Sequence, residues 1–257
     1  MDSGNPKATP ADPNSHLTIS MSPTTESGTF AMRKIPYREA VGCLMYLTIV
    51  SRPDIAFAVG QESRYCENPG PAHWETVKRI LAYISSTRKQ GLFFSGSRQP
   101  LNGFSDADYG GYLDHRRSMT GYIFNHNGGP VAWCSRRKTC TTLSTTEAEY
   151  VAASETSKEA IWLRHLLQNI DLAKQNPVKI HCDNQRAIQL VRNPVFHGRT
   201  KHIDIRYHFI RDQLESNKID IIYIETKMQI ADILTKPLAT PLFERLRDQL
   251  GVIPAPI

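Results

Sequence analysis

Apolar residues recur along the chain with two different spacings, which divide it into a helical first part and a mixed second part. Between residues 34 and 95 they follow helical spacing in three runs that begin near Pro36, Ile55 and Ala72. Residues 1–33 contain four prolines among serines and threonines, a composition that predicts an irregular lead-in. The helical part holds no constellation of acidic, histidine or cysteine residues. We therefore expect it to pack against or position the rest of the chain.

From Leu101 onward the pattern alternates between strands and helices. Short apolar runs predict strands at 101–106, 119–125 and 130–135, before a long helix from about 145 to 168. Further strands are expected at 178–183 and 219–225, and further helices at 185–192, 202–215 and from about 229 onward. Three hairpin-connected strands followed by alternating helices and strands predict an α/β fold with a mixed sheet. The predicted parts are a lead-in (1–33), a helical segment (34–98), a sheet domain (99–240) and a C-terminal helix and tail (241–257).

Composition narrows the class of protein only slightly. The 257 residues are 40% hydrophobic and 22% charged, as in an ordinary globular protein, and no apolar run is long enough to cross a bilayer. The N-terminus lacks the apolar segment of a signal peptide, and five cysteines without a C-x-x-C pair suggest neither a disulfide framework nor a zinc site. We therefore expect an intracellular protein with no membrane partner. The net charge of +6 favours an anionic partner such as nucleic acid.

Four acidic residues lie where predicted elements begin or end. Asp106 ends the strand at 101–106, Glu147 lies in the first turn of the long helix, Asp183 ends a later strand, and Asp232 lies in the first turn of the final helix. Each has a structural reading of its own: turn chemistry, a capping box, a helix N-cap and compensation of the helix dipole. Glu149 is expected to point to another side of the helix.

Taken together, the four acids predict a metal site. Carboxylates at strand ends and helix starts can converge on one edge of a sheet, where they would repel one another without a cation. Two Mg²⁺ ions would balance the four negative charges, and hard oxygen ligands suit Mg²⁺ or Mn²⁺. Paired divalent ions about 3.5–4 Å apart are the usual apparatus for in-line displacement at phosphorus.

Several short motifs carry a resemblance to a known family. The chain resembles the ribonuclease H domain at the C-terminus of the Pol polyprotein of Copia-type LTR retrotransposons, on the stretches 104–111, 116–122, 144–150, 182–185, 199–208 and 231–237. Stretches 36–42, 51–56 and 73–74 resemble the segment that follows the polymerase palm in the same polyprotein. There is no Tyr-x-Asp-Asp element, so the chain looks like a fragment without the polymerase core, and polymerase activity is not expected of it.

The resemblance implies a ribonuclease H-like fold and a specific reaction. It implies that Asp106, Glu147, Asp183 and Asp232 are the metal-binding acids, with two Mg²⁺ ions, or Mn²⁺, as cofactors. The implied reaction is hydrolysis of the RNA strand of an RNA–DNA hybrid, with the rest of the Pol polyprotein as a partner. It would take place in a cytoplasmic particle or in the nucleus. Many ribonucleases H also use a histidine before the last acid, but residues 225–230 contain none.

Basic residues near the acids are candidates for contacts with the phosphates of the hybrid, because lysine and arginine bind phosphates without regard to sequence. The predicted phosphate contacts are Arg116, Arg117, Arg136, Arg137, Lys138, Arg199 and Lys201. Asn184 and Gln185 are predicted to contact the 2′-hydroxyls that distinguish RNA from DNA. Three histidines, His197, His202 and His208, are read as packing or phosphate contacts rather than zinc ligands.

Three other readings remain open at this stage. The chain could be a nucleic-acid-binding module without turnover, if the helical segment cannot hold the substrate in register. It could also be a structural relic without activity. A transposase-like nuclease of the same broad fold fits less well, because the flanking motifs point to the retrotransposon family.

Overall fold

The computed structural model describes residues 5–112, 114, 117–138, 142, 144–170, 176–192 and 201–254, with the backbone alone for 112 and 201–207. The first part is helical, as predicted, and its helices are α1 (Glu26–Arg33), α2 (Tyr37–Val50), α3 (Ala56–Glu62) and α4 (Pro71–Ser86). Short 3₁₀ turns, η1 (Ile19–Met21), η2 (Pro53–Ile55) and η3 (Ser63–Tyr65), connect them. Among the described residues, no helix is both long and apolar enough to cross a membrane.

The expectation of an irregular lead-in over 1–33 is wrong for its last quarter, which forms helix α1. The prolines end at Pro23, and Thr25 then caps the helix, because its hydroxyl accepts a hydrogen bond from the backbone N–H of Gly28 at 3.2 Å. Farther upstream, a side chain of α4 holds part of the lead-in. Arg79 donates to the carbonyl of Thr9 and forms an ion pair with Asp12.

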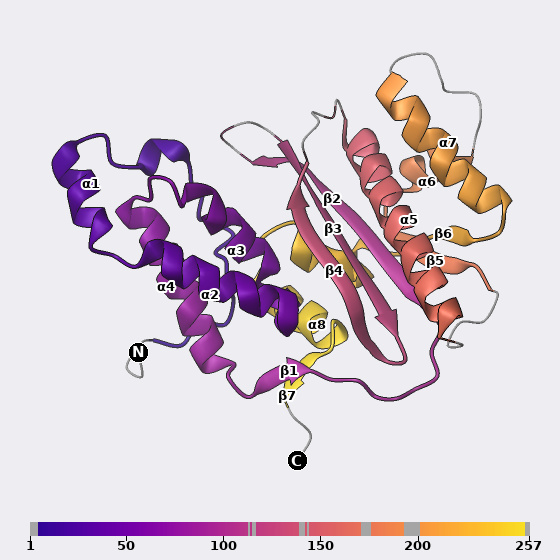
Figure 1. Ribbon diagram of the computed structural model, residues 1–257, viewed down its shortest axis with the longest axis horizontal. Helices are drawn as coiled ribbons and strands as arrows, with labels where there is room; N and C mark the ends of the chain where they lie inside the picture. Colours follow the sequence, from indigo (N-terminus) through magenta and orange to yellow (C-terminus); the bar gives the residue numbers. More distant parts are fainter. Residues whose placement is uncertain are drawn as a thin grey trace.

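The second part is built on a five-stranded mixed sheet with the strand order β4-β3-β2-β5-β6 (Figure 1). Its strands are β2 (Asn102–Tyr112), β3 (Arg117–His126), β4 (Gly129–Arg137), β5 (Val178–Cys182) and β6 (Ile219–Tyr223). The first three pair antiparallel, and β5 and β6 run parallel to β2. A tight turn at Asn127 and Gly128, both with positive φ, joins β3 to β4. The expected α/β fold, with three antiparallel strands before alternating helices and strands, is confirmed.

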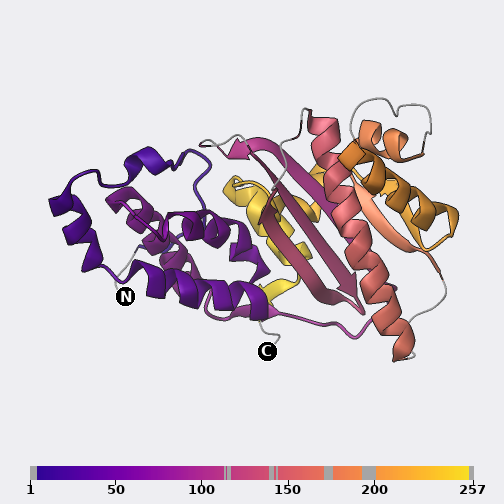
Figure 2. The ribbon, with the colours of Figure 1, turned by 45° about the horizontal axis from the view of Figure 1, so that its top comes forward.

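Helices cover both faces of this sheet (Figures 1 and 2). The helices α5 (Thr145–Asn169), α6 (Gln185–Arg192) and α7 (Lys201–Glu215) lie on one face, over a core that includes Tyr150, Ile180 and Ile221. The opposite face carries the 3₁₀ helix η5 (Ile230–Leu234) and the helix α8 (Thr240–Gln249). The predicted final helix is therefore two elements, which are separated around Pro237 because proline lacks the N–H that a continuing helix needs.

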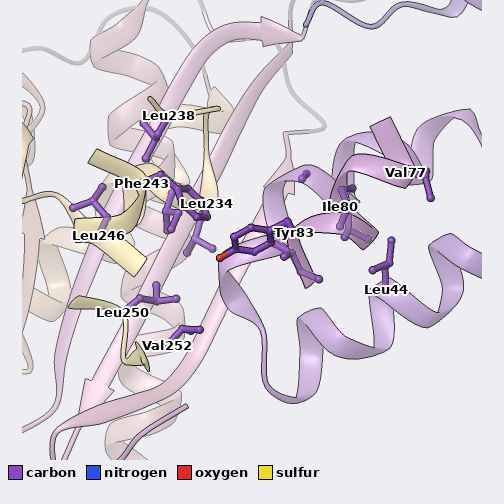
Figure 3. Close-up of a cluster of buried hydrophobic side chains, with 14 of the residues drawn as sticks. Leu44, Val77, Ile80, Tyr83, Leu234, Leu238, Phe243, Leu246, Leu250 and Val252 are labelled. Atoms are coloured by element: carbon purple, nitrogen blue, oxygen red, sulfur yellow. The ribbon is translucent and has the colours of Figure 1, made fainter. Parts of the chain in front are cut away.

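One apolar core joins the helical part to the C-terminal elements. It includes Leu44, Ile80 and Tyr83 from the first part together with Leu234 and Phe243, and the ring of Tyr83 meets that of Phe243 edge to face at 5.6 Å (Figure 3). Strand β1 (Gln90–Leu92) pairs antiparallel with β7 (Val252–Pro254), which closes the same region. The predicted boundaries at 98/99 and 240/241 stay predictions, and the core is continuous across them.

Candidate active site

The central strand β2 places Asp106 on the face that carries η5. Neighbouring side chains alternate between the two faces of a strand, and Ser105 and Ala107 face α5 instead. The hydroxyl of Thr156 donates to that of Ser105 at 2.9 Å, and the N–H of Ala107 donates to a carboxylate oxygen of α5. Asp106 is 2% exposed, and its Oδ2 accepts a hydrogen bond from the hydroxyl of Thr235. Its carboxylate is thus fixed by two elements at once.

The parallel strand β5 brings Asp183 to the same end of the sheet. Phe104 of β2 lies opposite His181 of β5, so the residue that follows β5 comes level with Asp106. Carboxylate oxygens of Asp106, Asp183 and Asp232 all lie within 4.8 Å of one another. The structure therefore brings together three of the four acids that the sequence singled out.

Asp232 reaches this group because η5 lies flat against the sheet. The fully buried Gln229 anchors it: its Nε2 donates to the carbonyl of Ser105 at 2.9 Å, and its Oε1 accepts from the N–H of Ala231. The close approach also requires Gly121 of β3, where a Cβ would lie 2.7 Å from Cγ2 of Thr235. Sequence reasoning missed the role of Gln229, since it depends on a contact between distant segments.

Of the two glutamates at the start of α5, the structure brings Glu149 to the acidic cluster, whereas the sequence analysis singled out Glu147. Glu147 is half-exposed in the first turn of α5, where its N–H donates to the capping hydroxyl of Ser144 at 3.2 Å. Glu149 is only 6% exposed, and its Oε1 accepts from the N–H of Ala107 at 3.2 Å. One of its carboxylate oxygens lies within 4.8 Å of ligand atoms of Cys182 and Asp183.

The rotation of the helix explains why only one of the two glutamates reaches the cluster. Two residues along an α-helix turn the side chain by roughly 200°, so Glu147 and Glu149 occupy opposite sides. The buried side of α5 contains Glu149, Ala153 and Thr156, which lie at spacings of four and three. Thr156 contacts Ser105 of the central strand, so this row faces the sheet. The small residues of the row were the signal in the sequence that could have identified Glu149.

The residues present fit a divalent cation. Among the described side chains, Oε2 of Glu149 and Oδ1 of Asp232 are buried carboxylate oxygens without a hydrogen-bond partner. Burying such an oxygen is costly unless a donor or a cation satisfies it. Oxygen ligands of this kind suit Mg²⁺ or Mn²⁺. The nearby Cys182 fits less well, because burial raises the pKa of its thiol and keeps it protonated.

The cluster carries electrostatic strain. The pKa values of Glu149, Asp183 and Asp232 are all raised, first by burial and then by the charge of Asp106. Burial also raises the pKa of Asp108, to about 6. The ammonium of Lys236 compensates part of the negative charge of these carboxylates. Burial by itself lowers its pKa, but the neighbouring acids, Asp106 foremost, raise it by more.

The predicted contacts with nucleic acid lie in different environments. Arg117 is half-buried at the start of β3, while Arg136 and Arg137 end β4, and Arg136 is 66% exposed with Glu155 at 3.6 Å. Lys138, in contrast, is 6% exposed, and its ammonium donates to the carbonyl of Ala148 at the start of α5.

Of the remaining predicted contacts, one side chain has a structural role and others are exposed. The side-chain oxygen of Asn184 accepts from the N–H of Ala187 at 3.0 Å, so it caps α6, whereas Gln185 is exposed. His208 is exposed on α7. Several predictions fall outside the described residues or side chains, namely those for Arg116, His197, Arg199, Lys201 and His202.

Comparison with known proteins gives the family. No family model matches the chain. It is 45% identical over 252 residues to the retrovirus-related Pol polyprotein from transposon TNT 1-94 of Nicotiana tabacum, a match that covers 98% of this chain and 19% of the relative. It is 38% identical over 252 residues to the Pol polyprotein from transposon RE2 of Arabidopsis thaliana, covering 98% of this chain and 17% of the relative.

Among solved structures, the LC11 ribonuclease H1 isolated from compost is 14% identical, with a TM-score of 0.40 over 53% of this chain and 92% of that chain. The chain spans less than a fifth of the length of the two Pol polyproteins that it matches. The identity to them extends over both the helical part and the sheet. The chain therefore belongs to the family of retrovirus-related Pol polyproteins of Copia-type retrotransposons.

Proposed function

We propose that this segment of Pol is a ribonuclease H-type hydrolase, which cleaves the RNA strand of an RNA–DNA hybrid. One observation carries the proposal: carboxylates from β2, α5, η5 and the residue after β5 converge at one place on the sheet, and Oε2 of Glu149 and Oδ1 of Asp232 are buried there without a hydrogen-bond partner among the described residues. Carboxylates are rarely collected in this way for stability, because their mutual repulsion costs folding energy. Such a collection is typical of sites that bind divalent cations for phosphoryl chemistry.

Asp106, Glu149, Asp183 and Asp232 would hold the cation, which we propose to be Mg²⁺, or Mn²⁺, as a pair of ions. When bound, such ions lower the pKa of water and neutralise charge that develops on phosphate oxygens. The rest of the chain keeps the ligands in place. Thr235 orients Asp106 and the N–H of Ala107 orients Glu149.

The substrate would lie across the ends of β3 and β4. Arg117, Arg136 and Arg137 come from this edge, and their guanidinium groups suit phosphates. Gln185 is an exposed residue directly after Asp183, in a position to meet a 2′-hydroxyl. We propose that the remainder of Pol supplies the polymerase that makes the hybrid, and that both act inside the cell.

The experiment that tests the function is cleavage of a labelled RNA–DNA hybrid by the purified chain in Mg²⁺ and in EDTA. We expect loss of the RNA strand only, in Mg²⁺ only, and no loss with Asp106→Asn. Asp220→Asn is the matched control. Asp220 is a residue of β6 that lies away from the cluster and forms an ion pair with Arg192 of α6. Hybrid binding without cleavage by a folded chain would refute the hydrolase and leave a binding module.

A further inference from the structure

Lys236 occupies an unusual position for a lysine. It lies two residues after the end of η5, and its Nζ lies 3.0 Å from Oδ2 of Asp232 and 4.0 Å from Oδ2 of Asp106. The side chain of Lys236 is 34% exposed, but the two carboxylates are each 3% exposed. An ammonium on a flexible four-carbon stem therefore reaches from the surface into the acidic cluster.

This contact differs from the ordinary ion pairs of the chain. Lys78 and Glu75 of α4 lie 2.6 Å apart, but their side chains are 46% and 69% exposed, so water screens both charges. Asp106 and Asp232 are shielded from water, and they meet Asp183 within 4.8 Å. In such a place an ion pair is much stronger, and a carboxylate without a cation is much less stable.

The same two carboxylates belong to the set that fits a divalent cation. Oδ2 of Asp232 faces the ammonium, while its other oxygen, Oδ1, is buried without a partner among the described residues. One oxygen of the Asp232 carboxylate is therefore paired with an ammonium, while the other lacks a hydrogen-bond partner among the described residues. An ammonium and a divalent cation in contact with the same carboxylates would repel each other strongly.

We propose that Lys236 is a resident cation of the cluster, which holds Asp106 and Asp232 together before metal binds and withdraws from them when metal binds. The second half rests on the proposed function, since it needs a metal site; the first half does not. Lys236 is then a positioning residue. When metal binds, the divalent cation takes the place of the ammonium beside Asp106 and Asp232. The side chain of Lys236 is one-third exposed, which gives the ammonium a path to solvent.

The first half is tested by thermal unfolding in EDTA. Lys236→Met keeps the length of the side chain and removes the charge, so we expect a melting temperature at least about 3 °C below that of the wild type. Lys78→Met removes a charge from an exposed pair and should change the melting temperature by less than about 1 °C. Equal melting temperatures for Lys236→Met and the wild type would overturn the resident-cation role.

The second half is tested by titration with Mn²⁺ alone. If metal must displace the ammonium, Lys236→Met will bind Mn²⁺ about tenfold more tightly than the wild type, and Lys78→Met will bind like the wild type. Unchanged or weaker binding by Lys236→Met would refute the exchange. Absence of binding by both the wild type and Lys236→Met would refute the metal site itself, but the unfolding result in EDTA would stand.

A labelling experiment on the wild type removes any dependence on how the variant folds. Acetylation of lysines by an activated ester, read by mass spectrometry, should modify Lys236 several-fold faster in saturating Mg²⁺ than in EDTA. Lys78 is the internal control and should react at the same rate in both. A rate at Lys236 that is equal or slower in Mg²⁺ would contradict withdrawal of the ammonium.

Discussion

Glu149→Gln and Glu147→Gln make a matched pair that separates the structure from the sequence motif. Both changes remove one negative charge from the same turn of α5. Glutamine keeps the Oε1 atom with which Glu149 accepts the N–H of Ala107. The structure predicts that Glu149→Gln abolishes hybrid cleavage and stabilises the metal-free chain, whereas Glu147→Gln does neither.

The expected sizes follow from the spacing of the charges. Oxygens of Glu149 and Asp183 lie within 4.8 Å. Two unit charges at that distance interact by about 3–4 kcal/mol at an effective dielectric constant of about 20. Burial and the charge of Asp106 raise the pKa of Glu149, so the repulsion that Glu149→Gln relieves is smaller than that between two full charges at the same distance. Glu149→Gln would also remove an attraction of similar size between the site and a bound cation. A loss of about 3–4 kcal/mol in the transition state lowers the rate of hybrid cleavage by about 10²–10³-fold.

Two assays read the two effects. Scanning calorimetry in EDTA should place the melting temperature of Glu149→Gln above that of the wild type, by about 2–4 °C for each kcal/mol of repulsion removed. Cleavage of the labelled hybrid in Mg²⁺ should fall by at least about a hundredfold in Glu149→Gln and stay within about twofold in Glu147→Gln. Lost cleavage in Glu147→Gln with retained cleavage in Glu149→Gln would refute the assignment. A lower melting temperature for Glu149→Gln in EDTA would refute the repulsion.

Three further changes test other parts of the fold. Burial raises the pKa of Glu62 to about 8, so stability falls as pH rises from about 4.5 to about 8; Glu62→Gln should remove this fall in melting temperature. Asp54→Ala leaves the buried guanidinium of Arg52 without its ion-pair partner at 2.7 Å and should cost about 3–5 kcal/mol in urea unfolding. Gly121→Ala would press against Thr235 and lift η5, at about 1–3 kcal/mol of stability and with slower hybrid cleavage.

Asp183 could be placed from the sequence because it directly follows a strand, β5. Asp106 was expected at the end of a strand over 101–106, but β2 continues to Tyr112, so this acid lies within the strand. The two acids still meet, because β2 and β5 are parallel and in register. The phase of a helix is harder to predict near its start. The capping box drew attention to Glu147, although only the packed side of α5 identifies Glu149. The contacts of Gln229 with Ser105 and of Lys236 with Asp106 join segments far apart in the chain, so no local pattern indicates them.

The pairing of β1 with β7 bears on the order of events during synthesis. Gln90 lies opposite Pro254, and the core that contains Tyr83 also contains Leu250 and Val252. A chain that leaves the ribosome from its N-terminus completes its helical part early but lacks these partners until residues up to 254 have emerged. The helical part can therefore complete its packing only after the C-terminal strand has been made, and contacts of such long sequence separation are the kind that slow folding.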